Sequence, residues 1–150
     1  MRAARAQDHI FPSYREHVVA TTRGVDPIDI IRVMRGLTHG GWDPTDPRNG
    51  NVHIYTLVLG SQTLHATGYG MGLVFDKRCG TGDPQRDEAV IVYYGDGASS
   101  QGDVHEAVRL AHLLAPNPDG SPLRFVDIGA PVRDAEGRTQ AVLATHLSWE

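Results

Sequence analysis

The sequence is poor in cysteine, in lysine and in long hydrophobic runs, and each shortage excludes a class of protein. Cys79 is the single cysteine, so an internal disulfide is impossible and we expect a cytoplasmic protein. No apolar run approaches the roughly 18 residues of a membrane-spanning helix. The first ten residues lack the apolar core of a signal peptide. We therefore expect no membrane partner.

The chain also lacks an excess of positive charge. Its formal net charge is −4 at pH 7, and Lys77 is its one lysine. A protein that binds nucleic acid through the phosphate backbone needs a basic surface, so we expect no nucleic-acid partner. What the chain has in abundance is glycine and proline, 17 and 9 of its 150 residues, which indicate many tight turns.

Two helices are marked by local signals in the first half of the chain. Over residues 25–36, Asp26 can cap a helix, Pro27 suits the first helical position, and Gly36 can end the helix. The segment 61–75 carries several small residues that favour close backbone packing, so we predict a buried helix. Residues 52–60, which precede it, are apolar and β-branched enough to be extended.

The second half begins with a strand that leads into a helix. Residues 89–94, "AVIVYY", form a short continuous apolar run between turn signals, which is typical of a buried parallel strand. A helix follows from Asp103, where Asp103 and Glu106 have the spacing of a capping box. Residues 123–150 indicate a strand, a turn and a strand, with a hairpin tip at 135–137.

The glycines between this strand and helix suggest a phosphate site. Glycine lets the backbone approach an anion, and a helix N-terminus adds free N–H groups. Asp96, between Gly95 and Gly97, would repel bare phosphate unless a divalent cation lay between them. Mg²⁺ is bound by one or two carboxylates with phosphate oxygens, so Asp96 is a candidate metal ligand. On spacing alone, a plain tight turn is the alternative.

Several motifs in order carry a resemblance to a known family. They are "FPSYREH", "TRGVDP", "HGGWDP", "GSQTLHATGYGMG" and "GTGDPQRDEAVIVYYGDGASSQGDVHEA". Together they resemble the alpha subunit of the thiamine-diphosphate-dependent component of 2-oxo acid dehydrogenase complexes, which act on pyruvate or branched-chain 2-oxo acids. The resemblance covers about residues 8–114. It implies an α/β thiamine-diphosphate-binding fold, with a parallel sheet flanked by helices, incomplete in this chain and followed by a short β-hairpin tail.

The resemblance implies roles for particular residues. Asp96 would bind Mg²⁺, and Gly95, Gly97 and Ala98 would line the diphosphate of thiamine diphosphate. Tyr14 and Arg15 would contact the cofactor, Arg15 through diphosphate oxygens that suit its guanidinium fork. Pairing of Arg15 with Glu16 or a nearby aspartate is the alternative. Leu57 and Leu59 would lie near the cofactor ring.

The family reaction decarboxylates a 2-oxo acid and passes the acyl group to a lipoyl acyltransferase partner. The general acid that activates the cofactor comes from a separate beta subunit, so the resemblance assigns no catalytic residue to this chain. It implies an alpha subunit that works with a beta subunit. We divide the chain into a partial dehydrogenase domain over residues 1–115, a linker over 116–122 and a β-rich tail over 123–150.

The chain departs from the family pattern in one respect that bears on the metal. The thiamine diphosphate motif closes about 25–30 residues after its Gly-Asp-Gly with Asn-Asn, and this sequence contains no Asn-Asn. Asp127 could substitute as a ligand. The tail weakly resembles the last strands of bacterial sensor modules. A non-catalytic protein that uses only the fold, as a pseudo-enzyme or a sensory or interaction module, is therefore the alternative function.

Overall fold

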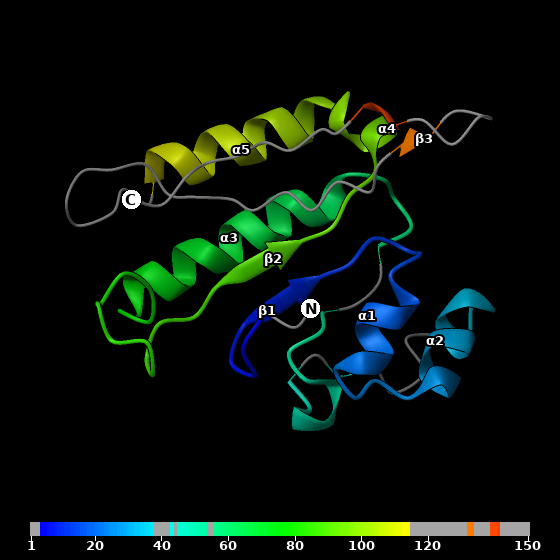
Figure 1. Cartoon of the computed structure of the whole chain (residues 1–150), viewed down its shortest axis with the longest axis horizontal. Coiled ribbons are helices and arrows are strands. Elements are labelled where there is room, and N and C mark those ends of the chain that lie inside the picture. The colour runs from blue at the N-terminus through cyan, green and yellow to red at the C-terminus, as the bar shows by residue number, and fades with distance from the viewer. Residues whose placement is uncertain are drawn as a thin grey trace.

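The structure of the chain is a computed structural model, and it describes residues 4–37, 43, 45–53, 56–114, 132–133 and 139–141. Short strands are separated by groups of helices along it (Figure 1). In chain order the elements are β1 (His9–Phe11), α1 (His17–Thr22), α2 (Pro27–Met34), the 3-10 helix η1 (Pro47–Asn49), α3 (Ser61–Phe75), β2 (Val90–Val92), α4 (Asp96–Ser99), α5 (Gly102–Leu114), β3 (Val132–Arg133) and β4 (Thr139–Ala141). The predicted α/β fold is confirmed.

A small parallel sheet organises the first 114 residues. Strands β1 and β2 run parallel, with His9 opposite Val90 and Phe11 opposite Val92. On the other side of β1, Val52 forms a parallel bridge with Ile10. Strand β1 therefore lies between two parallel neighbours, and the predicted parallel sheet is present.

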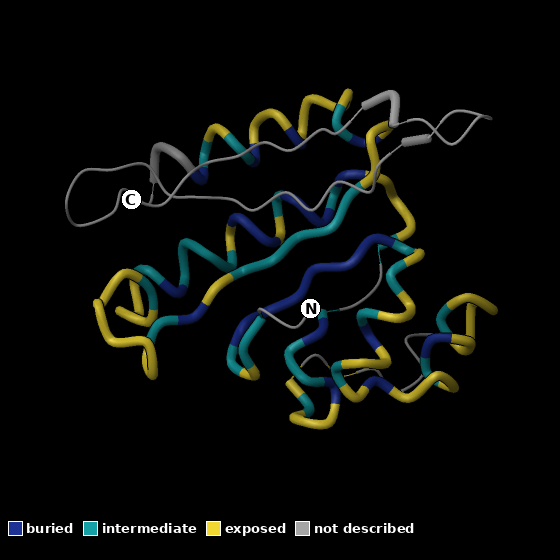
Figure 2. Tube along the Cα trace, in the orientation of Figure 1, coloured by how far each residue is buried: buried dark blue, intermediate teal, exposed yellow. Residues whose placement is uncertain are grey.

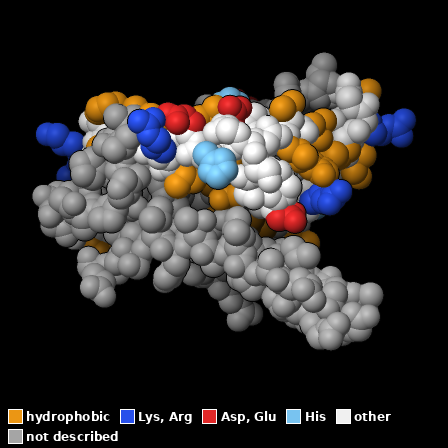
Figure 3. Space-filling model, turned by 90° about the horizontal axis from the view of Figure 1, so that it is seen from above, with side chains coloured by type: hydrophobic (Ala, Val, Ile, Leu, Met, Phe, Trp, Pro, Cys, Tyr) orange, Lys and Arg blue, Asp and Glu red, His pale blue; other side chains and the backbone are white. Residues whose placement is uncertain are grey.

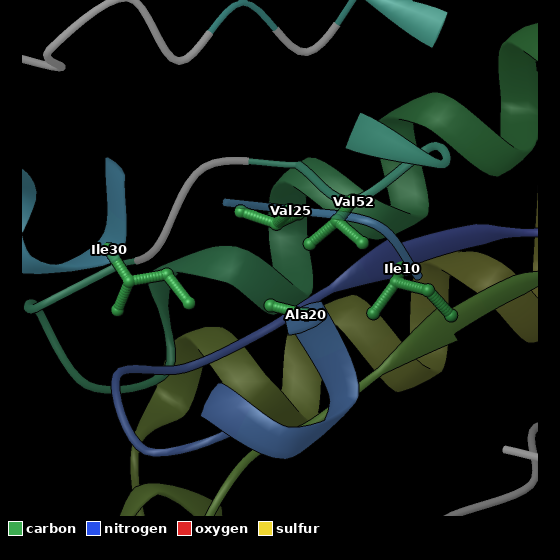
Figure 4. Close-up of a cluster of buried hydrophobic side chains, with 5 residues drawn as sticks. All are labelled: Ile10, Ala20, Val25, Ile30 and Val52. Atoms are coloured by element: carbon green, nitrogen blue, oxygen red, sulfur yellow. The ribbon is translucent and has the colours of Figure 1, made fainter. Parts of the chain in front are cut away.

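The two faces of β1 meet different helices because side chains alternate along a strand. Ile10 packs with Ala20 of α1, Ile30 of α2, and with Val25 and Val52, in one buried cluster (Figure 4). His9 and Phe11 point to the opposite face, where their rings contact Tyr69 of α3. Helices thus flank the sheet on both sides.

The face that carries Tyr69 is covered by the long helix α3, and α5 packs against α3 (Figures 1 and 2). Ala66 and Leu73 of α3 are buried, as are Val104, Ala107 and Ala111 of α5. These small side chains let the helices approach closely. The predicted helix over Ser61–Phe75 is confirmed, but it is only partly buried, and a Cβ at Gly68 or Gly72 would meet nothing within 4 Å.

Helix α2 shows the local signals that the sequence contains. The carboxylate of Asp26 accepts a 2.8 Å hydrogen bond from the backbone N–H of Ile28, and Pro27 occupies the first helical position. The predicted cap is therefore confirmed. Only Ile30 of this helix is buried, whereas Ile28 and Ile31 are about half exposed.

Three expectations about the other elements differ from the structure. Strand β2 is half-buried rather than buried, since β1 is its one partner strand among the described residues. Helix α5 begins at Gly102, so Asp103 lies inside it, and the carboxylate of Glu106 accepts from Arg109 at 2.8 Å instead of capping the helix. Of the described residues in 52–60, only Val52 pairs with a strand.

The tail contains the antiparallel pair that a hairpin requires. Val132 of β3 lies opposite Ala141 of β4, and Arg133 lies opposite Thr139. The proposed linker, residues 116–122, and Asp127 lie outside the described residues. No helix within the described ranges is long and apolar enough to cross a membrane.

Candidate functional site

The carboxyl ends of β1 and β2 bring two predicted cofactor segments to one edge of the sheet. The backbone N–H of Tyr93 donates to the carbonyl of Phe11 at 2.9 Å, just beyond the paired Val92. Because the strands are parallel, the chain leaves both of them at this edge. Tyr14 and Arg15 follow β1, and residues 95–98 follow β2. Ligands of open parallel sheets bind beyond this end of the strands.

Arg15 is exposed to solvent at this edge. Its guanidinium carbon lies 4.8 Å from the ring centroid of the half-buried Tyr14, within the range of a cation–π contact. Its backbone N–H donates weakly to the Glu16 carboxylate at 3.4 Å. Within the described part of the chain the guanidinium forms no ion pair. Among the described residues Arg15 therefore forms no ion pair with Glu16 or with an aspartate, which was the alternative to a diphosphate contact.

The Gly-Asp-Gly segment forms the start of a single helical turn. Gly95 has an extended backbone and precedes α4, whose first residue, Asp96, is exposed to solvent. A Cβ atom added at Gly95 or Gly97 would meet no heavy atom within 4 Å. Packing therefore does not require glycine at either position, and there is open space beside the backbone. A diphosphate could approach through that space.

The third predicted segment lies immediately before α3. Leu57 and Leu59 are 59% and 40% exposed, so their apolar side chains are available to a ligand. Gly60 follows with a left-handed backbone (φ +88°), and a Cβ there would lie 3.2 Å from Val104 and 3.9 Å from the carbonyl oxygen of Ala98. The start of α3 thus lies against the turn that contains Asp96.

The described residues fit a metal that takes most of its ligands from a diphosphate. They contain no group of three or more histidine, cysteine, aspartate or glutamate side chains that could hold a metal ion. The exposed carboxylate of Asp96 lies at the carboxyl edge of the sheet, where Glu16 next to Arg15 supplies a second carboxylate. Mg²⁺ is held in this way when substrate phosphates and water complete its shell.

A second polar cluster, which the sequence analysis missed, lies on the α3 side of β1. The buried His9 and Glu88 are joined by a 2.9 Å contact between Nε2 and Oε2. The other oxygen of Glu88 accepts from the guanidinium of Arg78, at 2.8 Å from Nε. His9 Nδ1 lies 3.3 Å from Nε2 of His53. These contacts join residues up to 79 positions apart, and no sequence motif marks them.

This cluster borders a cavity of about 790 Å³. The rings of Phe11, His53 and Tyr69 line it, together with the exposed His65 of α3. Burial and the neighbouring His9 lower the pKa of His53 to about 4, so its imidazole is neutral at pH 7. Aromatic rings and the neutral imidazole of His53 therefore form part of the lining, and the cation of Arg78 also borders the cavity.

Comparison with known proteins places the chain in a family. A sequence model of the family described as "Dehydrogenase E1 component" matches residues 1–116. The chain belongs to this family. The matched range contains all the segments that converge near Asp96.

Named relatives of this E1 family member are longer than the chain. It is 36% identical over 110 residues to the 3-methyl-2-oxobutanoate dehydrogenase subunit alpha of Mycobacterium tuberculosis, covering 73% of this chain and 27% of the relative. It is 30% identical over 113 residues to the testis-specific human mitochondrial pyruvate dehydrogenase E1 component subunit alpha, covering 71% of this chain and 26% of that protein. The chain thus spans about a quarter of the length of these curated relatives.

Proposed function

We propose that this chain acts as the alpha subunit, or part of the alpha subunit, of a thiamine-diphosphate-dependent 2-oxo acid dehydrogenase. The proposed activity is oxidative decarboxylation of pyruvate or a branched-chain 2-oxo acid, with transfer of the acyl group to a lipoyl acyltransferase. In this proposal residues 1–115 form the dehydrogenase portion, 116–122 a linker and 123–150 a separate β-rich tail. The proposed location is the cytoplasm.

The observation that carries the proposal is the parallel pairing of β1 with β2. Because of this pairing, the Tyr14–Arg15 segment and the turn with Asp96 both follow strands that end at the same edge of the sheet. About 80 residues separate the two segments in the sequence. One segment offers a guanidinium that forms no ion pair within the described ranges, and the other offers an exposed carboxylate between two glycines. A cation bridging Asp96 to a diphosphate that also contacts Arg15 would satisfy both charges.

Each residue at the edge has a proposed role. Arg15 would bind diphosphate oxygens, Asp96 would bind Mg²⁺, and Tyr14 would stack beside the guanidinium. The backbone of Gly95, Gly97 and Ala98 would line the diphosphate. Leu57 and Leu59 would contact the apolar ring system of the cofactor. When bound, thiamine diphosphate would supply the decarboxylation chemistry, and the protein would bind and orient it.

The proposed partners follow from the family. The names of both relatives include "subunit alpha", and we propose that this chain likewise requires a beta subunit. A lipoyl acyltransferase would be the second partner. On the face seen in Figure 3, acidic, basic and histidine side chains are scattered over the described surface and form no single charged patch.

The second candidate function is a non-catalytic role that uses only the fold. One sequence feature favours it: the chain contains no Asn-Asn to complete the metal shell. The exposed Arg15 and the open Gly-Asp-Gly turn favour cofactor binding instead. A direct binding measurement separates the two.

The deciding experiment is calorimetric titration of the chain with thiamine diphosphate, with and without Mg²⁺ and with and without a beta subunit. We expect saturable binding that requires Mg²⁺ and is lost in Asp96→Ala. Asp103→Ala is the matched control, since Asp103 is also an exposed acidic residue in the first turn of a helix. No saturable binding under any of these conditions would reject the catalytic proposal and favour the non-catalytic one.

A further inference from the structure

We propose that Gln62 is a positioning residue that holds the turn carrying Asp96 in place. Gln62 lies in the first turn of α3 and is 1% exposed. Its side-chain Nε2 donates a 2.8 Å hydrogen bond to the backbone carbonyl of Tyr93. Tyr93 is two residues before Gly95, so this bond acts on the chain just before it enters the proposed cofactor turn.

The bond to Tyr93 fixes the orientation of the amide. A carbonyl oxygen only accepts hydrogen bonds, so the NH₂ group of Gln62 must face Tyr93 and Oε1 must point the other way. Oε1 is buried and has no hydrogen-bond partner among the described residues. An unsatisfied buried polar atom costs about 1–3 kcal/mol. A methionine of similar volume would avoid that cost, so the contribution of the amide here is its bond to Tyr93.

The position of Tyr93 explains why this bond affects the turn. Its N–H donates to the carbonyl of Phe11 in β1, while its carbonyl accepts from Gln62 in α3. The backbone at Tyr93 is therefore held by two elements that are distant in sequence. Beyond it, the described backbone bonds of the turn are local, such as the 3.0 Å bond from the Ala98 N–H to the Gly95 carbonyl. Gln62 thus links α3 to the base of this turn.

The same helix start also joins the apolar segment to this turn. Gly60 packs against Val104 and Ala98, and the exposed Leu57 and Leu59 lie just before it. Gln62 therefore couples two segments that, in the proposed function, contact different parts of one cofactor. Gln62 itself is not proposed to touch the cofactor, because its effect reaches the turn through its bond to Tyr93. This role in cofactor binding rests on the proposed function, whereas the effect on the turn does not.

Hydrogen exchange of the full chain, without cofactor, tests the effect on the turn. We expect Gln62→Met to speed exchange of the amides of Tyr93, Ala98 and Ser99 by about fivefold, the effect of losing one ordinary hydrogen bond. Thr67→Val is the matched control, because Thr67 is a buried polar residue of α3 whose hydroxyl lies within hydrogen-bond distance of the carbonyls of Thr63 and Ala107 and makes no bond to β2. Equal exchange of these three amides in the two variants would overturn the proposal.

Gln62→Glu provides a second readout that remains informative if Gln62→Met does not fold. An ionised carboxylate cannot donate to the Tyr93 carbonyl, whereas the protonated acid can. After correction for intrinsic exchange rates, protection of the Tyr93, Ala98 and Ser99 amides should return as the pH falls and the carboxyl takes up a proton. Protection that does not change with pH would contradict the proposed bond.

Titration with thiamine diphosphate and Mg²⁺ then tests the link to cofactor binding. We expect Gln62→Met to weaken the affinity about fivefold relative to Thr67→Val. Equal affinities would overturn the role in cofactor binding. If the unmodified chain bound no thiamine diphosphate, the proposed function would fail, and the exchange comparison would still decide whether Gln62 positions the turn.

Discussion

The backbone N–H of Tyr93 lies 2.9 Å from the carbonyl oxygen of Phe11, and this hydrogen bond joins β2 to β1 just before both strands end. Because the strands are parallel, the bond fixes how the two following segments leave the sheet relative to each other. Arg15 lies four residues beyond Phe11, and Asp96 lies three residues beyond Tyr93. The proposed contacts of Arg15 with diphosphate and of Asp96 with Mg²⁺ therefore depend on the pairing of two short strands.

Replacing Arg15 with lysine should weaken the binding of thiamine diphosphate although the charge is kept. Lysine is a point charge, and it cannot present the planar pair of N–H groups that matches diphosphate oxygens. Loss of one charge-assisted hydrogen bond corresponds to a fall in affinity of about tenfold or more. Calorimetric titration measures it, with Arg109→Lys as the control, since Arg109 pairs with Glu106 on α5. Equal affinities would exclude a bidentate contact from Arg15.

Local signals in the sequence predicted α2 and α3, but they did not indicate α1 or α4. Asp26, Pro27 and Gly36 delimit α2 through contacts within a few residues, and the structure contains that helix with its cap. The capping box expected at the start of α5 is not formed. The carboxylate of Glu106 accepts a hydrogen bond from the Arg109 guanidinium and not from the backbone at the start of the helix. Short-range patterns describe a helix, but they do not decide between two nearby partners of one side chain.

Contacts between distant residues could not be predicted from the sequence. The parallel sheet was expected, but the pairing of Val52 with Ile10 on the second side of β1 was not. The contacts of His9 with Glu88 and with His53 span 79 and 44 positions and follow no motif. The cofactor roles of Arg15 and Asp96 came from the family resemblance, and they remain predictions that binding experiments must test.

Gly50 should be intolerant of alanine, whereas Gly36 should accept it at moderate cost. Both glycines have left-handed backbones, with φ of +54° and +67°. An added Cβ would lie 2.1 Å from the carbonyl oxygen of Arg23 at Gly50, and would meet nothing within 4 Å at Gly36. We expect Gly36→Ala to lower the free energy of unfolding by about 1–2 kcal/mol, the cost of a left-handed alanine.

The Gly50→Ala variant adds a clash with backbone to that conformational cost. We expect a loss of more than about 3 kcal/mol, because a core segment must shift to relieve the overlap. Urea unfolding of the two variants measures the difference. Similar losses for both would show that the approach of Gly50 to Arg23 is not tight.

The free energy of unfolding should fall as the pH is lowered from about 6.5 to 4, because His53 takes up a proton more readily in the unfolded chain. Burial and the nearby His9 lower the pKa of His53 to about 4, from its ordinary value of 6.5. In that range the unfolded chain binds a proton that folded His53 does not, so protonation favours unfolding. The contribution is fully present above pH 6.5 and is lost as the pH falls toward 4.

Urea unfolding at several pH values tests this dependence. The groups around the His53 ring are His9, Phe11 and Tyr69, with Glu88 and Arg78 beyond His9. His53→Phe keeps an aromatic ring beside Phe11 and removes the titrating group, so we expect a shallower fall between pH 6.5 and 4. An unchanged pH profile would show that other groups cause the acid sensitivity.

Gly97→Ala should separate cofactor binding from stability. Gly97 lies inside the short helix α4, and an added Cβ would meet no heavy atom within 4 Å. Alanine is the better helix former by about 1 kcal/mol, so the folded chain should be no less stable. A diphosphate lying against this backbone, however, would meet the new methyl group. We expect the affinity for thiamine diphosphate with Mg²⁺ to fall about tenfold or more.

Gly102→Ala is the matched control for this change. Gly102 is the first residue of α5, and a Cβ there would also meet nothing within 4 Å. Both variants exchange glycine for alanine in open space on a helix, but only Gly97 belongs to the proposed diphosphate turn. Calorimetric titration and urea unfolding of the two variants should give similar stabilities and different affinities. If a diphosphate lay against this turn, the methyl group of Gly97→Ala would collide with it and weaken binding. Equal affinities of Gly97→Ala and Gly102→Ala would therefore mean that no diphosphate lies there.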